Sequence, residues 1–176
     1  MSGTAGAPHP APRFLADVML ERLARWLRAA GVDTSSAPST APDDAVRTLA
    51  RREDRVLLTR DRRLADACAA DAPLDARHPA CYRVRAAAPL AQLVEVAAAC
   101  GLGRPALTFT RCLVCNAELR PAAAAEVFRP PAAPVPPDKA LWKCPTCGRV
   151  YWEGAHPRRM RLALARALAE ADRHGG

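Results

Sequence analysis

The sequence lacks the features that place a protein in a membrane or outside the cell. Its 176 residues contain no apolar run of the roughly 20 residues that a membrane-spanning helix requires. The start, MSGTAGAPHPAP, lacks the charged beginning and apolar core of a secretion signal. Aromatic residues make up only 5% of the chain, so we expect a core of leucine, valine and alanine. We therefore expect a cytoplasmic protein with no membrane partner, and a disordered leader over residues 1–12.

A complete disulfide framework is also unexpected, because the seven cysteines are an odd number. Cys68, Cys81 and Cys100 stand alone in apolar surroundings, where we expect small buried side chains rather than reactive thiols. The other cysteines form two Cys-x-x-Cys pairs with 28 residues between them. These four residues are Cys112, Cys115, Cys144 and Cys147. Four thiolates are enough for a closed tetrahedral site, so we expect one structural Zn²⁺.

The residues around the second pair indicate that this zinc site belongs to a ribbon. Pro145 and Gly148 are typical of a tight turn, and a strand is expected over 149–152. We place a small zinc ribbon at 106–156, with a proline- and alanine-rich insertion at 121–137. A redox dithiol remains an alternative for either pair taken alone, but is not expected for both together.

The balance of charge points to a polyanionic partner. There are 26 lysines and arginines against 18 acids, which gives a net charge of +8 and favours nucleic acid. Residues 157–176 form a basic amphipathic helix and tail, although a solvated helix face explains most of its arginines equally well. The arginines that we expect to contact RNA phosphates are Arg25, Arg28, Arg60, Arg62, Arg63, Arg158 and Arg159.

Three strand-then-helix patterns predict an α/β domain over residues 13–105. The apolar run 14–16 precedes a helical pattern that ends at Gly31, and the run 55–59 precedes a helix over 63–70. A third run begins at 81 and leads into a helix from Pro89 to Cys100. Between the first two patterns we expect a poor strand over 32–34, a loop over 35–42 and a short helix opened by two aspartates. Such units imply a parallel sheet with helices on its faces.

Several aspartates follow these strands. Asp17 and Asp61 come directly after apolar runs, and Asp43 and Asp44 open the short helix. At one edge of a parallel sheet such carboxylates would repel one another, and a Mg²⁺ or Mn²⁺ ion held by Asp17 and Asp61 would relieve that repulsion. A site of this kind activates water and neutralises charge on a phosphoryl group. The alternative is that these acids are helix caps and surface ion pairs.

The sequence from Arg13 to about Met160 resembles the Mut7-C RNase family, a branch of the PIN-like nucleases. In the α/β part, the resemblance rests on FLAD with LARWLR and GVD after it, on Asp43-Asp44 before Leu49-Ala50, and on LLTRD. In the ribbon it rests on RCLVCN and on WKCPTCGRVYW. No single one of these motifs is specific, but together they are.

The resemblance implies a PIN-like three-layer α/β/α fold with a parallel sheet, followed by a zinc ribbon. It also implies cleavage of single-stranded RNA at an acidic Mg²⁺ or Mn²⁺ centre, where Asp17 and Asp61 match the acids of the first and third strands. Asp43 matches the acid that opens the second helix better than Asp44 does. The family pattern has a small residue at position 21, where this sequence has Glu21. PIN nucleases commonly have a fourth acid, and Asp66 is the nearest candidate for it here.

These observations leave three hypotheses. The first is a metal-dependent endoribonuclease, favoured by aspartates that follow strands. The second is a non-catalytic RNA-binding protein, associated with ribosomes or tRNA, in which the acids are vestigial. The third is a zinc-stabilised interaction protein without nucleic acid, which the density of arginine disfavours.

Overall fold

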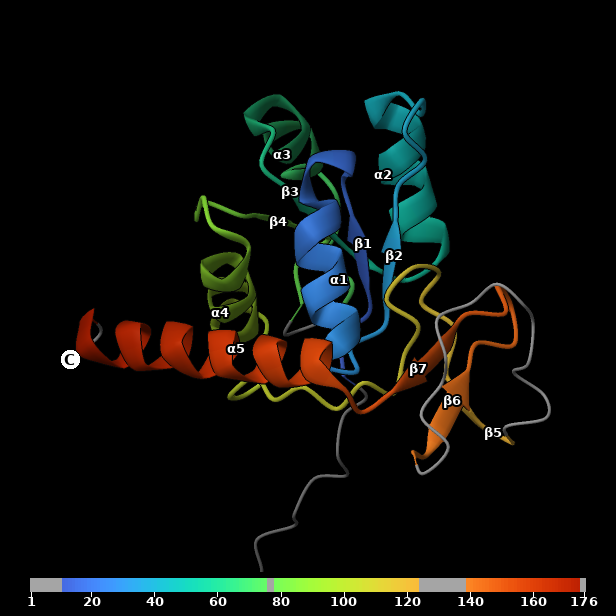
Figure 1. Cartoon of the computed structure of the whole chain (residues 1–176). Coiled ribbons are helices and arrows are strands. Elements are labelled where there is room, and N and C mark those ends of the chain that lie inside the picture. Colours follow the sequence, from blue (N-terminus) through green and yellow to red (C-terminus); the bar gives the residue numbers. More distant parts are fainter. Residues whose placement is uncertain (1–10, 76–77, 124–138, 175–176) are drawn as a thin grey trace, which may run out of the picture.

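The computed structural model describes residues 11–75, 78–123 and 139–174. It is a mixed α/β structure in which a parallel four-stranded sheet is followed by a small antiparallel sheet (Figure 1). The parallel strands are β1 (Phe14–Ala16), β2 (Thr34–Ser36), β3 (Val56–Thr59) and β4 (Cys81–Arg83). The antiparallel strands are β5 (Arg120–Ala122), β6 (Leu141–Lys143) and β7 (Val150–Trp152). The helices are η1 (Val18–Leu20), α1 (Glu21–Ala29), α2 (Asp43–Arg52), α3 (Arg62–Cys68), α4 (Pro89–Ala99) and α5 (Ala155–His174).

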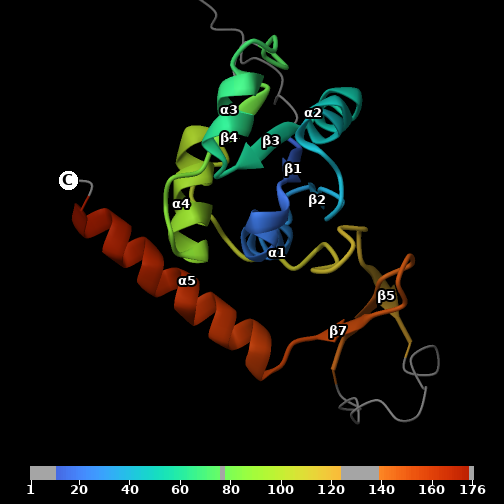
Figure 2. The ribbon, with the colours of Figure 1, turned by 90° about the horizontal axis from the view of Figure 1, so that it is seen from above.

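The order of the parallel strands, β2-β1-β3-β4, sets which face each helix covers. The connection from β1 to β2 runs in one direction across the sheet, and those from β2 to β3 and from β3 to β4 run in the other. Since such crossovers share one hand, α1 lies on one face, whereas α2 and α3 lie on the other (Figure 2). The chain after β1 and the chain after β3 therefore leave the sheet in opposite directions, which makes the carboxyl ends of β1 and β3 a topological switch point.

Two apolar cores hold the three layers together. Alternate residues of β1 point to opposite faces, so Phe14 and Ala16 belong to one core and Leu15 to the other. The first core also contains the apolar faces of α1 and α4 and, from α5, Leu164 and Leu168. The second is formed with α2 and α3. Cys68 and Cys100 are buried in these cores and Cys81 is half-buried, in agreement with their expected role as small core residues.

Two expected elements lie at different positions. The second strand covers Thr34–Ser36 instead of 32–34, because the Val32 N–H still bonds to the Leu27 carbonyl at the end of α1 and pairing with β1 begins only when the Asp33 carbonyl accepts from the Phe14 N–H. The residues assigned to the start of the insertion form β5, which accepts Pro121 because β5 is an edge strand. Most of the expected leader and most of the insertion, at residues 1–10 and 124–137, lie outside the described residues.

The loop after α4 returns to the carboxyl end of α1 and connects the two sheets. Gly31 ends α1 with a φ of +84°, and a Cβ there would lie 2.5 Å from the Thr108 hydroxyl. The Phe109 N–H donates to the Ala29 carbonyl at 2.9 Å. This close approach explains the glycine and fixes where the ribbon begins. Among the described residues, no helix is long and apolar enough to cross a membrane.

Candidate functional site

Asp17 lies at the switch point, directly after β1, and its side chain is almost fully buried. Its N–H donates to the Leu58 carbonyl at 2.9 Å, which extends the pairing of β1 with β3. Its Oδ2 accepts a 2.6 Å hydrogen bond from the hydroxyl of Thr59, the last residue of β3. The neighbouring strand thus orients this carboxylate.

Asp61 is connected to the same hydroxyl. Its N–H donates to Thr59 Oγ1 at 3.0 Å. Its Oδ1 caps α3 by accepting from the N–H groups of Arg63 at 2.6 Å and Leu64 at 3.2 Å. Its Oδ2 makes no hydrogen bond within the described residues. Thr59 therefore links the side chain of Asp17 to the backbone of Asp61. The carboxylate of Asp61 is itself held by the first N–H groups of α3.

Asp43 and Asp44 are the first two residues of α2, and both are exposed. Asp44 forms an ion pair with Arg47 at 3.3 Å, while its side chain is 93% exposed. In the described part of the chain, no three carboxylates have oxygens within 4.8 Å of one another. The structure therefore connects the carboxylate of Asp17 to the backbone of Asp61 through Thr59, and among the described residues it brings no third carboxylate into a cluster with them.

Glu21 is a further carboxylate at this edge, four residues after Asp17. Its Oε2 accepts a hydrogen bond from the hydroxyl of Ser36, the last residue of β2, at 2.5 Å, and Arg28 lies 3.4 Å from its Oε1. The sequence signal for Glu21 is its departure from the small residue of the family pattern. Thr59 was not identified from the sequence, where its only signal is a hydroxyl residue that ends an apolar strand.

Most of the expected RNA-binding arginines are exposed. Arg60, Arg62 and Arg63 follow β3 and begin α3, beside Asp61. Arg62 forms an exposed ion pair with Asp66 at 3.6 Å. The remaining exposed members of the set are Arg25 on α1 and Arg158 and Arg159 on α5.

Arg28 is the exception, and the structure corrects the expectation that it contacts RNA. Its side chain is 2% exposed, and its guanidinium donates to the carbonyls of Thr34 at 2.7 Å, Leu113 at 3.1 Å and Val114 at 3.0 Å. It also donates to the Ser36 hydroxyl at 2.6 Å. These acceptors come from β2 and from the loop between Cys112 and Cys115. Arg28 therefore joins the α/β sheet to the ribbon and has no surface left for a phosphate.

The four paired cysteines form a cluster that could hold a metal such as zinc. Their sulfur atoms all lie within 4.8 Å of one another. The Sγ atoms of Cys112 and Cys147 are 3.6 Å apart, and those of Cys115 and Cys144 are 3.3 Å apart. The Asn116 N–H donates to the Cys112 carbonyl, and the Gly148 N–H donates to the Cys144 carbonyl, both at 3.0 Å. Four convergent sulfurs fit the ligand set of a closed tetrahedral Zn²⁺ site.

Groups around the cysteines position them. The Tyr151 hydroxyl lies 3.1 Å from Cys112 Sγ and accepts from the Leu113 N–H at 3.2 Å. Burial alone would raise the pKa of the Cys112 thiol, but donors from Cys115, Tyr151 and Val114 lower it to about 6. Burial raises the pKa of the Cys115 and Cys147 thiols, so the surroundings favour loss of the proton at Cys112 first.

A partly buried polar network attaches the first cysteine loop to the α/β sheet. Asn116 accepts from the Thr34 N–H at 3.0 Å and donates to Asp33 Oδ1 at 2.7 Å. Asp33 also binds Arg55 at 2.6 Å and Arg13 at 3.1 Å. Burial alone would raise the pKa of Asp33, but the hydrogen bonds from Arg55 and Asn116 outweigh burial and hold its pKa at about 2. The charged form of Asp33 thus stabilises this attachment.

Asp33→Asn is expected to lower the free energy of unfolding by about 2 kcal/mol at neutral pH. Because the folded pKa lies below the ordinary 3.8, the contribution is complete above pH 3.8 and is lost as the pH falls toward 2. The difference in free energy of unfolding is measured by denaturant unfolding of both proteins from about pH 6 to about pH 2. Asp66→Asn, on the exposed surface of α3, serves as control. A difference that stayed constant with pH would contradict the assignment.

Comparison with known proteins identifies the family. A model of the Mut7-C RNAse domain matches residues 12–164. The matched region includes the parallel sheet, the Asp17–Thr59–Asp61 link, all four paired cysteines and the first half of α5. No curated protein and no solved structure matches the chain. Since the family model covers most of the sequence, the chain belongs to the Mut7-C RNAse domain family.

Proposed function

We propose that the protein is a metal-dependent endoribonuclease that cleaves single-stranded RNA at the carboxyl edge of its parallel sheet. The observation that carries the proposal is the linkage of Asp17 and Asp61 through the Thr59 hydroxyl. This linkage lies at the switch point between β1 and β3, where open α/β sheets bind their ligands. The family match to an RNase domain supports a nuclease or RNA-related role. The layered parallel sheet supports a PIN-like fold.

Asp17 and Asp61 are the proposed ligands of a Mg²⁺ or Mn²⁺ ion. Carboxylate oxygens are the donors that these ions prefer, and Asp61 Oδ2 is not used by the cap of α3. Such an ion supplies an activated water and stabilises negative charge on the phosphoryl oxygens. Thr59 keeps the buried carboxylate of Asp17 oriented. Asp43, rather than Asp44, completes the acidic edge in this proposal, because Asp44 is engaged with Arg47.

The exposed arginines at this edge are the proposed contacts to RNA phosphates. Arg60, Arg62 and Arg63 surround Asp61, and Arg25 follows Glu21 by one turn of α1. Their positive charge would hold the phosphates that flank the scissile bond. Arg28 is left out of this set because it is buried.

The ribbon is proposed to be a scaffold held by one Zn²⁺ ion on four thiolates. In this proposal the chain divides into a nuclease domain at 13–105, a ribbon at 106–156 and a basic helix with its tail at 157–176. Arg28 and Asn116 support a structural role, because they bind the first cysteine loop firmly to β2.

The direct test is cleavage of a labelled single-stranded RNA by the purified full-length protein. We expect cleavage that requires added Mg²⁺ or Mn²⁺, and little cleavage of the same sequence in a duplex. Cleavage that persists in a chelator too weak to remove zinc would contradict the proposed metal dependence. A preparation of the Asp17→Asn protein, purified in parallel, controls for contaminating nucleases.

RNA binding is expected to weaken steeply with salt, because the proposed contacts are between arginines and phosphates. Changing Arg60, Arg62 and Arg63 together to glutamine should reduce the slope of log Kd against log salt by about 2. Fluorescence anisotropy with a labelled RNA across a salt series measures both slopes. Affinity that does not change with salt would rule out this binding mode.

A second candidate function is RNA binding without catalysis. It is favoured by the absence of any three clustered carboxylates in the part described, where neither Asp43 nor Asp44 joins Asp17 and Asp61 in one cluster. In this case Asp61 is the cap of α3, and Asp17 fixes the end of β3. Tight, salt-dependent RNA binding without cleavage in any divalent metal would support this second candidate.

A further inference from the structure

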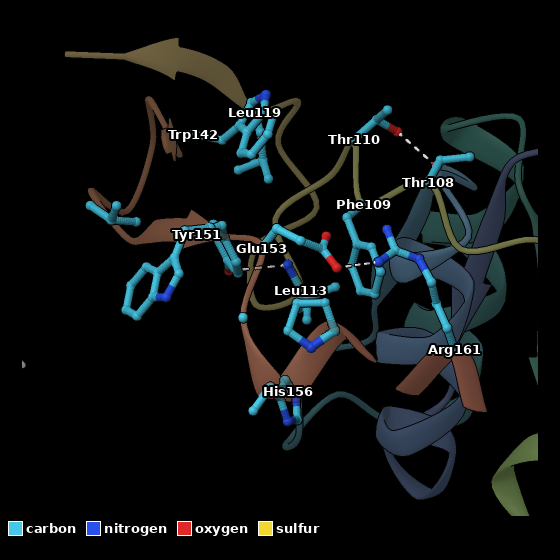
Figure 3. Close-up of a pocket in the computed structure, with 15 residues that line it drawn as sticks. Thr108, Phe109, Thr110, Leu113, Leu119, Trp142, Tyr151, Glu153, His156 and Arg161 are labelled. Atoms are coloured by element: carbon cyan, nitrogen blue, oxygen red, sulfur yellow. Dashed lines mark hydrogen bonds and ion pairs between the residues drawn. The ribbon is translucent and has the colours of Figure 1, made fainter. Parts of the chain in front are cut away.

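A pocket with a volume of about 580 Å³ lies between the ribbon, the loop 108–110 and the first turns of α5 (Figure 3). Its walls are mostly aromatic and aliphatic. It is distinct from the acidic edge, because neither Asp17, Glu21 nor Asp61 is among the residues that line it. The aromatic residues that line it are Phe109, Trp142, Tyr151 and Trp152.

The aromatic rings of the pocket are held in place before any ligand binds. Trp142 and Tyr151 lie directly opposite each other on β6 and β7, so their side chains share one face of the ribbon. The hydroxyl of Tyr151 is bound at the first cysteine loop, and Phe109 lies 5.0 Å beneath the guanidinium of Arg161. That guanidinium also pairs with Glu153 at 2.5 Å. Trp142 nevertheless remains 37% exposed, which leaves its ring accessible.

The charge around the pocket favours a ligand that is apolar and flat but is attached to an anionic chain. Arg158 and Arg159 are exposed on α5, next to the pocket residues His156 and Pro157. An aromatic platform beside exposed arginines is the combination by which proteins bind single-stranded nucleic acid, since bases stack on the rings and phosphates bind the cations.

We infer that this pocket binds an unpaired base of the RNA strand, by stacking on Trp142, outside the proposed cleavage site. The inference depends on the proposed function only in taking RNA as the ligand. The helix α1, with nine residues, is about 14 Å long and runs from the acidic edge toward the loop 108–110 of the pocket. Arg22 and Arg25 are exposed along this helix, so a strand of a few nucleotides that joins the sites would pass cationic side chains.

The test compares two short strands of equal length and charge, one a normal single-stranded RNA and the other made of abasic residues. Binding is measured by anisotropy in the zinc-loaded Asp17→Asn protein without added divalent metal, so that no strand is cleaved. We expect the normal strand to bind about tenfold more tightly than the abasic one. Adding Trp142→Ala should remove this difference, whereas Trp142→Phe should retain most of it. Leu162→Ala, which changes a residue of α5 that is 54% exposed and outside the pocket, should have no effect.

Tryptophan emission provides a second measurement that needs no substitution in the pocket. The normal strand should quench the emission on binding, and the abasic strand should not. Equal affinity for the two strands, or unchanged binding by a Trp142→Ala protein that still holds zinc, would overturn the inference and favour an apolar peptide as the occupant. Because no cleavage is measured, these results stand whether or not the protein is a nuclease.

Discussion

Asp17→Asn is expected to lower the rate of RNA cleavage by more than about 100-fold while the protein remains folded. Loss of a group that only orients a metal ligand commonly costs 10- to 100-fold, so loss of the ligand's charge should cost more. Asparagine keeps the shape of the side chain and an oxygen that accepts from Thr59. The measurement is the single-turnover rate in Mn²⁺, together with the thermal unfolding midpoint of both proteins.

Asp61→Asn should have a similar effect, and it separates catalysis from folding. Asparagine is as good an N-cap as aspartate, so the cap of α3 is retained and only the charge is lost. The matched control is Asp54→Asn in the loop before β3, where the residue has a φ of 54° that asparagine also tolerates. Equal cleavage by the Asp17→Asn and unsubstituted proteins would show that the activity belongs to a contaminant or to another site.

Cys144→Ser is expected to remove zinc and to unfold the ribbon while the α/β domain remains folded. Four thiolates are needed for the closed site, and binding of structural zinc contributes about 10–16 kcal/mol in isolated zinc fingers. The α/β domain has two apolar cores, to which the ribbon strands β5–β7 contribute no residue. Elemental analysis should fall from about one zinc ion per chain to near zero. Limited proteolysis should then cut within 118–152 and spare 13–105.

The control for the loss of zinc is Cys100→Ser, which changes a buried thiol in the core formed by α1 and α4. This protein should keep its zinc, although the buried hydroxyl should make it less stable. A full complement of zinc in Cys144→Ser, or a disulfide between any two of the four cysteines in reduced extract, would contradict the proposed site.

The positions of β1 and β3 could be predicted from the sequence because both faces of these strands are covered. Phe14–Ala16 and Val56–Thr59 are buried at every position, so they stand out as apolar runs. β2, by contrast, is a polar edge strand with the sequence Thr-Ser-Ser. Its amide at Thr34 is satisfied by the side chain of Asn116, 82 residues away, which no local pattern reveals.

The candidate site could be predicted only in part. Asp17 and Asp61 follow predicted strands, but their connection depends on the register of β1 with β3 and on the single hydroxyl of Thr59. The series of arginines along α1 predicts an RNA contact for Arg28. Its burial depends on carbonyl groups of the distant loop 113–114, so a pattern of charge along one helix could not indicate it.

The most direct measurement is the anomalous density of Mn²⁺ soaked into crystals of the zinc-loaded protein. We expect one Mn²⁺ ion bound by oxygens of both Asp17 and Asp61, with Thr59 still donating to Asp17, and no such ion in crystals of Asp17→Asn. Density at the exposed carboxylates Asp43 and Asp44 alone, with none between Asp17 and Asp61, would contradict this expectation.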